Sequence, residues 1–267
     1  MKKYIFSILI SLLLLASCGE YQKLLKSTDA ELKYDKAVEY YQNKSYSKAI
    51  TLFDDVTPFF RGTDRSELIL NFLANSYMQQ KDYFSASEYF KTYIKSYPRG
   101  KFTAEAKYMI AYCYYLDSQD VRLDQTTTYQ AINAFQEYID IYPESERVKD
   151  ATKLLDELND KLAHKYYINS KLYYNLGTYL GNNYKSAVIT AENALKKFPA
   201  TKYREDLMIL ILQSKYQESL LSFEEIKSER FQATIDEYYN YINEFPEGKF
   251  RKDADKILKV AEKNTKE

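Results

Sequence analysis

Five prolines divide the chain at nearly regular intervals, and this spacing limits the folds that it can adopt. They are Pro58, Pro98, Pro143, Pro199 and Pro246, separated by 40, 45, 56 and 47 residues. Each follows an amphipathic stretch typical of a helix, and proline ends a helix because it lacks an N–H and clashes with the preceding turn. Recurrence at this period predicts an all-α array of helix-turn-helix units.

The residues around the prolines indicate the kind of repeat. The last four segments read YPRGKFTAEA, YPESERVKDA, FPATKYREDL and FPEGKFRKDA. Counted back from Pro98 in the tetratricopeptide register of about 34 residues, small residues fall at Ala74 and Ala86 and large ones at Tyr77 and Phe90. We therefore predict an α-solenoid of about five tetratricopeptide-like repeats that stack into a right-handed superhelix.

The same register predicts the domain limits. A repeat domain is expected over residues 29–267, with repeats near 30–63, 67–100, 104–145, 166–201 and 205–248. The polar stretch DSQDVRLDQTTT (117–128) is predicted to be an insertion loop in the third unit. The fourth and fifth units match the repeat pattern less closely than the first three.

The N-terminus has the form of a secretory signal. Residues 1–17 contain two lysines, an apolar run and the small residues Ala16 and Ser17 before Cys18, and the run is too short to span a membrane. This ending resembles the bacterial lipobox, which implies that Cys18 carries lipid, including palmitate, and that the lipid alone holds the chain on the membrane. Residues 18–28 would form the tether. The alternative is an ordinary signal peptide in which Cys18 is incidental.

Composition disfavours nucleic-acid binding and most enzyme chemistry. The 38 basic and 38 acidic side chains cancel, so no basic excess attracts nucleic acid. One His and two Cys provide little material for a metal or thiol site, and the glycines form no phosphate-binding motif. Cys113 and His164 are predicted to be packing residues. We expect no catalytic residues, no metal and no cofactor.

The order of these features resembles a narrower group than the repeat class, the BamD family of lipoproteins in the outer-membrane β-barrel assembly (BAM) complex. The third-unit element that carries the resemblance comprises Arg122, Asp124, Gln125, Ala131, Phe135, Tyr142, Pro143 and Ser145. The resemblance implies a scaffold, not an enzyme, anchored in the outer membrane and facing the periplasm. Gly19, in place of an inner-membrane retention Asp, implies export to the same membrane. The implied partners are a BamA-type insertase, held through its periplasmic domains by the C-terminal units, and unfolded β-barrel precursors, recognised by the N-terminal units.

The first helices of the first two units are expected to line a groove that binds the C-terminal aromatic strand of a precursor. The predicted groove residues are Tyr34, Val38, Tyr41, Asn71, Asn75 and Met78, flanked by Glu31 and Leu68. Side-chain amides can bind a peptide backbone, and methionine adapts to apolar side chains. The alternative is that several of these side chains pack between units or meet solvent.

Two other functions stay open. One is a different envelope tetratricopeptide lipoprotein, such as a cell-division or Tol-Pal coordinator, which normally has fewer units and no insertion at 117–128. The other is a SusD-like glycan-binding lipoprotein. Such chains are longer and place Trp in their sugar sites, whereas this sequence contains no Trp.

Overall fold

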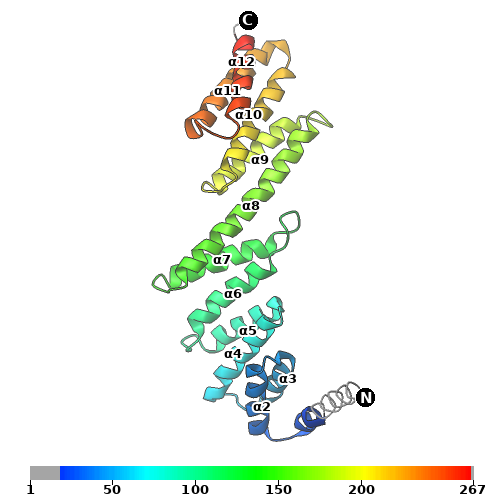
Figure 1. The fold of residues 1–267 in the computed structure, drawn as a ribbon, viewed down its shortest axis with the longest axis vertical. Coiled ribbons are helices and arrows are strands. Elements are labelled where there is room, and N and C mark those ends of the chain that lie inside the picture. The colour runs from blue at the N-terminus through cyan, green and yellow to red at the C-terminus, as the bar shows by residue number, and fades with distance from the viewer. Residues whose placement is uncertain (1–18, 266–267) are drawn as a thin grey trace, which may run out of the picture. The chain divides into compact units, whose positions relative to one another are not determined.

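The computed structural model describes residues 19–265, in which all regular secondary structure is helical (Figure 1). Cys18 and the leader lie outside the described residues. Residues 19–26 are helical. The helices that follow are α2 (Ala30–Gln42), α3 (Tyr46–Val56), α4 (Asp64–Gln79), α5 (Tyr83–Ser96), α6 (Thr103–Asp117), α7 (Thr126–Ile141), α8 (Val148–Leu176), α9 (Asn183–Lys197), α10 (Arg204–Leu220), α11 (Glu224–Glu244) and α12 (Arg251–Thr265). The all-α prediction is confirmed.

Short polar side chains begin several helices. Asp29 accepts a hydrogen bond from the Leu32 amide at 3.0 Å, and Asp82 accepts one from Ser85 at 3.0 Å. Asn182 caps α9 in the same way. These oxygens satisfy amides that have no partner inside the helix, a contribution of about 1 kcal/mol each.

The prolines end the helices as predicted. Each of the five lies two residues after the last residue of a helix, namely α3, α5, α7, α9 and α11. Before three of them, Tyr97, Phe198 and Phe245 share φ near −130° and ψ near 67°, outside the helical region. Proline restricts its predecessor in this way because its ring clashes with a helical neighbour. Thr57 is different, since it keeps helical dihedrals before Pro58.

Two segments show details that the repeat pattern did not specify. The predicted start of the fourth repeat, near residue 166, lies inside α8, which is one helix of 29 residues, Val148–Leu176. It contains neither Pro nor Gly, so nothing in it ends a helix. The extra length between Pro143 and Pro199 is therefore helix and not loop. In the third repeat, the insertion loop is shorter than the predicted 117–128, because α7 already begins at Thr126.

The described residues up to Ser118, together with Asn133–Ala151, form one compact unit, called unit 1 here. Its consecutive helices α2 to α6 pack against one another. The N-terminal core contains Phe53 and Phe72, whose rings stack with centroids 5.2 Å apart. A second core surrounds Phe90, from α5. This arrangement buries each helix mainly against its neighbours in sequence, as expected for stacked repeats.

Residues 119–132 and the described residues from Thr152 onward form a second compact unit, unit 2. Here α10 packs against α9, α11 and α12. Six consecutive residues of α10, Leu207–Leu212, are buried, because cores lie on both of its sides. A helix covered all round is apolar all round, which explains the sequence LMILIL. The prediction of helix-turn-helix repeats is thus confirmed in both units, while the repeat limits stay predictions.

No helix within residues 19–265 is both long and apolar enough to cross a membrane.

Candidate functional site

Tyr34 and Val38, two of the predicted groove residues, lie on the inner side of α2. Tyr34 is only 9% exposed, and its ring packs edge-on against Phe53 with centroids 6.2 Å apart. The Arg65 guanidinium lies 4.8 Å from the same ring. Val38 is partly buried against this core. The alternative of packing between helices therefore holds for Tyr34, whose ring a ligand cannot reach.

Three other predicted residues lie on the surface of unit 1 with polar atoms to spare. Tyr41 is half-buried, and its ring packs 4.8 Å from that of Phe72. The Asn75 amide donates to the Asn71 carbonyl at 2.8 Å and to its side-chain oxygen at 3.1 Å. Within residues 19–265, the side-chain nitrogen of Asn71 and the side-chain oxygen of Asn75 form no hydrogen bond. They leave an NH₂ donor group and a carbonyl acceptor, the two kinds of group with which a peptide backbone can pair.

Met78 joins the surface of α4 to the core. Its sulfur lies 3.6 Å from the Cys113 sulfur. Cys113 is fully buried, as predicted, and burial raises the pKa of its thiol to about 12. A thiol with so high a pKa is inert at neutral pH, because the thiolate is the nucleophile. If Met78 moves to contact an apolar ligand, it loses part of its contact with the Cys113 sulfur.

The loop between α6 and α7, in the third repeat, is held closed by one buried side chain, Gln125. Its amide donates to the Asp120 carbonyl at 2.8 Å and to the Leu123 carbonyl at 3.1 Å, and its oxygen accepts from the Thr128 hydroxyl at 2.8 Å. Lys165 of α8 donates to the same Leu123 carbonyl at 2.5 Å. The loop is therefore a fixed structure that presents Leu123, which is 54% exposed.

A recurring contact joins the proline turns to the helices before them. In unit 1, the Tyr93 hydroxyl donates to the Glu67 carboxylate and accepts from the Phe102 amide at 2.9 Å. The same carboxylate accepts from the Lys101 amide at 2.8 Å. This contact holds the turn after α5 against the start of α4.

The same contact recurs in unit 2. The Tyr241 hydroxyl donates to Glu205 at 2.8 Å and accepts from the Phe250 amide at 3.3 Å. In both turns a glycine, Gly100 or Gly248, sits against the tyrosine and glutamate oxygens. Sequence analysis missed this contact, although a Glu early in the first helix and a Tyr five residues before the proline recur in both units.

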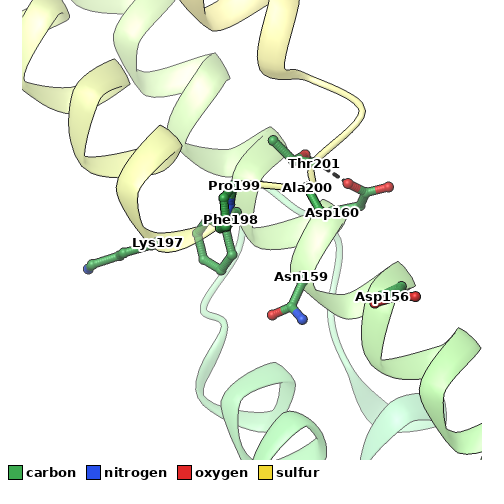
Figure 2. A pocket seen from close by; sticks show the side chains of 8 residues that line it. All are labelled: Asp156, Asn159, Asp160, Lys197, Phe198, Pro199, Ala200 and Thr201. Carbon is green, nitrogen blue, oxygen red and sulfur yellow. Dashed lines mark hydrogen bonds between the residues drawn. The ribbon is translucent and has the colours of Figure 1, made fainter.

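A pocket of about 250 Å³ lies in unit 2 between α8 and the turn that follows α9 (Figure 2). The Asp160 carboxylate of α8 joins the helix to this turn: it accepts a hydrogen bond from the Thr201 hydroxyl at 2.7 Å and another from the Lys202 amide at 3.1 Å. The Asp160 carboxylate therefore does what Glu67 does in unit 1, with Thr201 in place of the tyrosine. The Asp160 carboxylate in this pocket thus has a structural role.

Two neighbouring acidic side chains and the single histidine have structural partners. Asp54 and Asp55 have different partners, the Tyr89 hydroxyl and the Lys33 ammonium. His164 stacks on Tyr203 with ring centroids 4.6 Å apart. Within residues 19–265, no group of three or more His, Cys, Asp or Glu side chains could hold a metal ion.

The sequence matches one protein family over most of its length and is similar to three proteins named as assembly factors or putative assembly factors. Residues 26–231 match the family described as outer membrane lipoprotein (YfiO). A putative outer membrane protein assembly factor BamD from Aquifex aeolicus is 25% identical over 88% of this chain and 82% of its own length. The BamD of Rickettsia prowazekii is 22% identical over 68% and 70%. The BamD of Caulobacter vibrioides is 28% identical over 51% of this chain, and the match spans only 44% of that relative.

Among solved structures, the chain resembles the TPR2AB-domain:pHSP90 complex of yeast Sti1, with 12% identity and a TM-score of 0.41 over 87% of this chain and 98% of that one.

Proposed function

We propose a function from one premise, which is that the chain belongs to the YfiO family of outer membrane lipoproteins. The protein is a factor for the assembly of outer-membrane proteins. It is a scaffold without catalytic activity, anchored through lipid on Cys18 and facing the periplasm. The observation that carries this proposal is the family match over residues 26–231 on an array of helical repeats.

Unfolded β-barrel precursors are the substrates, and unit 1 receives them. Two features support this role: Asn71 and Asn75 of α4 offer a free donor and acceptor, and the half-buried Tyr41 ring of α2 packs on Phe72 of α4. An extended strand brings unpaired backbone N–H and C=O groups, and its aromatic side chains can pack beside Tyr41. Tyr34 takes no part, since it is a core residue.

A BamA-type insertase is the second partner, bound through its periplasmic domains by the C-terminal units. The surface of unit 2 supports a docking role, because an open groove of about 620 Å³ runs between α9 and α11. Most of its charged side chains are already paired, with Arg204 on Glu244 at 2.9 Å and Lys215 on Glu237 at 2.6 Å. A rigid, pre-paired surface loses little side-chain entropy when a folded domain docks on it.

The test is crosslinking in cells, followed by purification of the lipidated protein in mild detergent. Recovery of a large barrel protein with periplasmic repeat domains is the expected result. Recovery of cell-wall synthases or glycan transporters in its place would refute the assembly function and favour one of the two alternatives.

Precursor binding is tested with a photoreactive residue at Asn75 and a peptide that ends in an aromatic β-strand sequence. We expect crosslinks from Asn75 and none from the matched control at Thr92, an exposed residue of α5. Equal crosslinking at both positions would show that the peptide does not select the α2–α4 surface.

A further inference from the structure

Two turns on unit 2 expose large apolar side chains that no fold requirement explains. The first, called corner A, is the turn between α8 and α9 (residues 177–182), where Tyr179 is 67% and Leu180 90% exposed. The second, corner B, is the turn between α10 and α11 (residues 221–223), where Leu221 is 60% and Phe223 81% exposed. Single exposed apolar residues are ordinary, but four at neighbouring turns indicate an interaction surface.

The equivalent turns of unit 1 provide an internal comparison. The turn between α2 and α3 consists of Asn43, Lys44 and Ser45, and the turn between α4 and α5 of Gln80, Lys81 and Asp82. Each of these turns and corner A has one non-glycine residue with positive φ, at Lys44 (58°), Lys81 (64°) and Leu180 (55°). The same backbone conformation thus carries a lysine twice in unit 1 and a leucine in unit 2, so the turn itself does not demand an apolar side chain.

Leu180 also keeps an unfavourable conformation without gaining burial. A positive φ is costly for residues other than Gly, Asn and Asp, and burial of the side chain does not offset this cost at Leu180. The corner is nevertheless fixed, because the Asn183 amide donates to the Gly177 carbonyl at 2.9 Å and its side chain to the Tyr179 carbonyl at 2.7 Å. Leu180 is therefore held outward on a rigid turn.

A chain of hydrogen bonds links the two corners. Asn182 of corner A donates to Glu218 at 2.7 Å, Arg230 lies 3.2 Å from the same carboxylate, and Arg230 also donates to Ser222 of corner B at 3.0 Å. The corners therefore hold a fixed relation on the same part of unit 2. Two basic side chains near the corners already have acidic partners, since Arg230 pairs with Glu218 at 3.2 Å and Lys227 with Glu224 at 2.8 Å.

We propose that corners A and B insert Tyr179, Leu180, Leu221 and Phe223 into the interfacial region of a phospholipid bilayer and give the protein a second membrane contact besides its lipid. The family indicates a membrane as the binding partner of this surface, because its members are described as outer membrane lipoproteins. Tyrosine and phenylalanine beside leucine are suited to the boundary between headgroups and acyl chains. Because Arg230 and Lys227 are already paired with carboxylates, apolar contact drives the insertion, and anionic lipid is not needed.

This inference goes beyond the proposed assembly function and rests only on its membrane location. The test uses the lipidated protein in vesicles of phosphatidylethanolamine and phosphatidylglycerol, isolated by flotation. A fluorescent label is attached at Leu180→Cys or Phe223→Cys, and at Lys81→Cys as the matched control. Labelling is selective, because Cys113 is fully buried. Comparing the flotation of the lipidated protein with that of Cys18→Ser protein reports on the proposed anchoring separately from the quenching.

Quenching by lipids that carry a spin label on the acyl chain measures insertion. We expect strong quenching at positions 180 and 223, corresponding to a depth of about 5–10 Å, and only background quenching at position 81. Removing phosphatidylglycerol or raising the salt concentration should leave the quenching unchanged. Quenching no greater than at position 81 would overturn the proposal. So would labels that lipid never quenches but that a BamA-type periplasmic domain shields from aqueous iodide, which would make the corners a protein-binding surface.

Discussion

Gly100 and Gly248 occupy equivalent turns, and at both positions space decides the residue. Neither has positive φ, so backbone conformation does not require glycine there. A Cβ on Gly100 would lie 2.5 Å from the Tyr93 hydroxyl oxygen and 2.7 Å from a Glu67 carboxylate oxygen. The small size of glycine therefore makes room for the tyrosine and glutamate oxygens.

Gly100→Ala should therefore destabilise unit 1. Since the added methyl group must displace the Tyr93–Glu67 contact, we expect a loss of about 1–3 kcal/mol in the free energy of unfolding, measured by chemical denaturation. Gly19→Ala is the matched control, because nothing lies within 4 Å of a Cβ at that position. A denaturation midpoint for Gly100→Ala equal to that of the control would show that the turn relaxes freely.

The same contact makes stability depend on alkaline pH. Burial, followed by the bond to Glu67, raises the pKa of Tyr93 from its ordinary value of 10.0 to about 12. The folded state thus keeps a proton that the unfolded state loses, so this stabilising contribution is complete below pH 10 and is lost as the pH rises towards about 12. Tyr93→Phe should flatten the fall in stability over this range, whereas Tyr179→Phe, at an exposed position, should not. Parallel denaturation curves for both variants from pH 9 to pH 12 would contradict this assignment.

At the scale of whole elements, the sequence predicts helix ends well where proline is the cause. All five prolines end helices, because the restriction they impose is local and independent of packing. The length of α8 was not predictable in the same way. The 56 residues between Pro143 and Pro199 fit either a loop or a longer helix, and the repeat register favoured a start near 166.

The sequence also predicts the roles of side chains less well than the positions of helices. Tyr34 and Tyr41 share one face of the amphipathic pattern, yet Tyr34 is buried by Phe53 and Arg65, which come from other helices. Periodicity tells which side of a helix a residue occupies, but not which neighbour covers it. For the same reason, the Glu67–Tyr93 contact could be found only after the turn had been placed beside α4.

Gln125 decides the structure of the third-unit loop, and its removal should open that loop alone. In Gln125→Ala, the Asp120 carbonyl and the Thr128 hydroxyl lose a buried partner, at a cost of about 1–3 kcal/mol. We expect faster amide hydrogen exchange in residues 118–125 and unchanged exchange in α10. Gln130→Ala, at an exposed position of α7, serves as the control. Unchanged exchange in the loop would show that Lys165 alone is enough to hold it.

At the scale of the whole molecule, substitutions of the two cysteines test membrane anchoring and folding separately. If the proposed lipid on Cys18 holds the protein at the outer membrane, Cys18→Ser should move it to the soluble periplasmic fraction without changing its helicity. Cys113→Ala should have the opposite effect: removal of a fully buried sulfur next to Met78 lowers stability by about 1 kcal/mol or more and leaves the location unchanged.

Density-gradient fractionation with immunodetection measures the location, and circular dichroism of the purified variants measures helicity and stability. Because unfolded β-barrel precursors are the proposed substrates, the released Cys18→Ser protein should also lower the amount of folded barrel proteins in the outer membrane. Cys18→Ser protein that still sediments with the outer membrane would show that acyl chains are not needed for retention. Corners A and B and any docked insertase would then be the contacts to remove next, with Leu180→Asp combined with Phe223→Asp as the first variant.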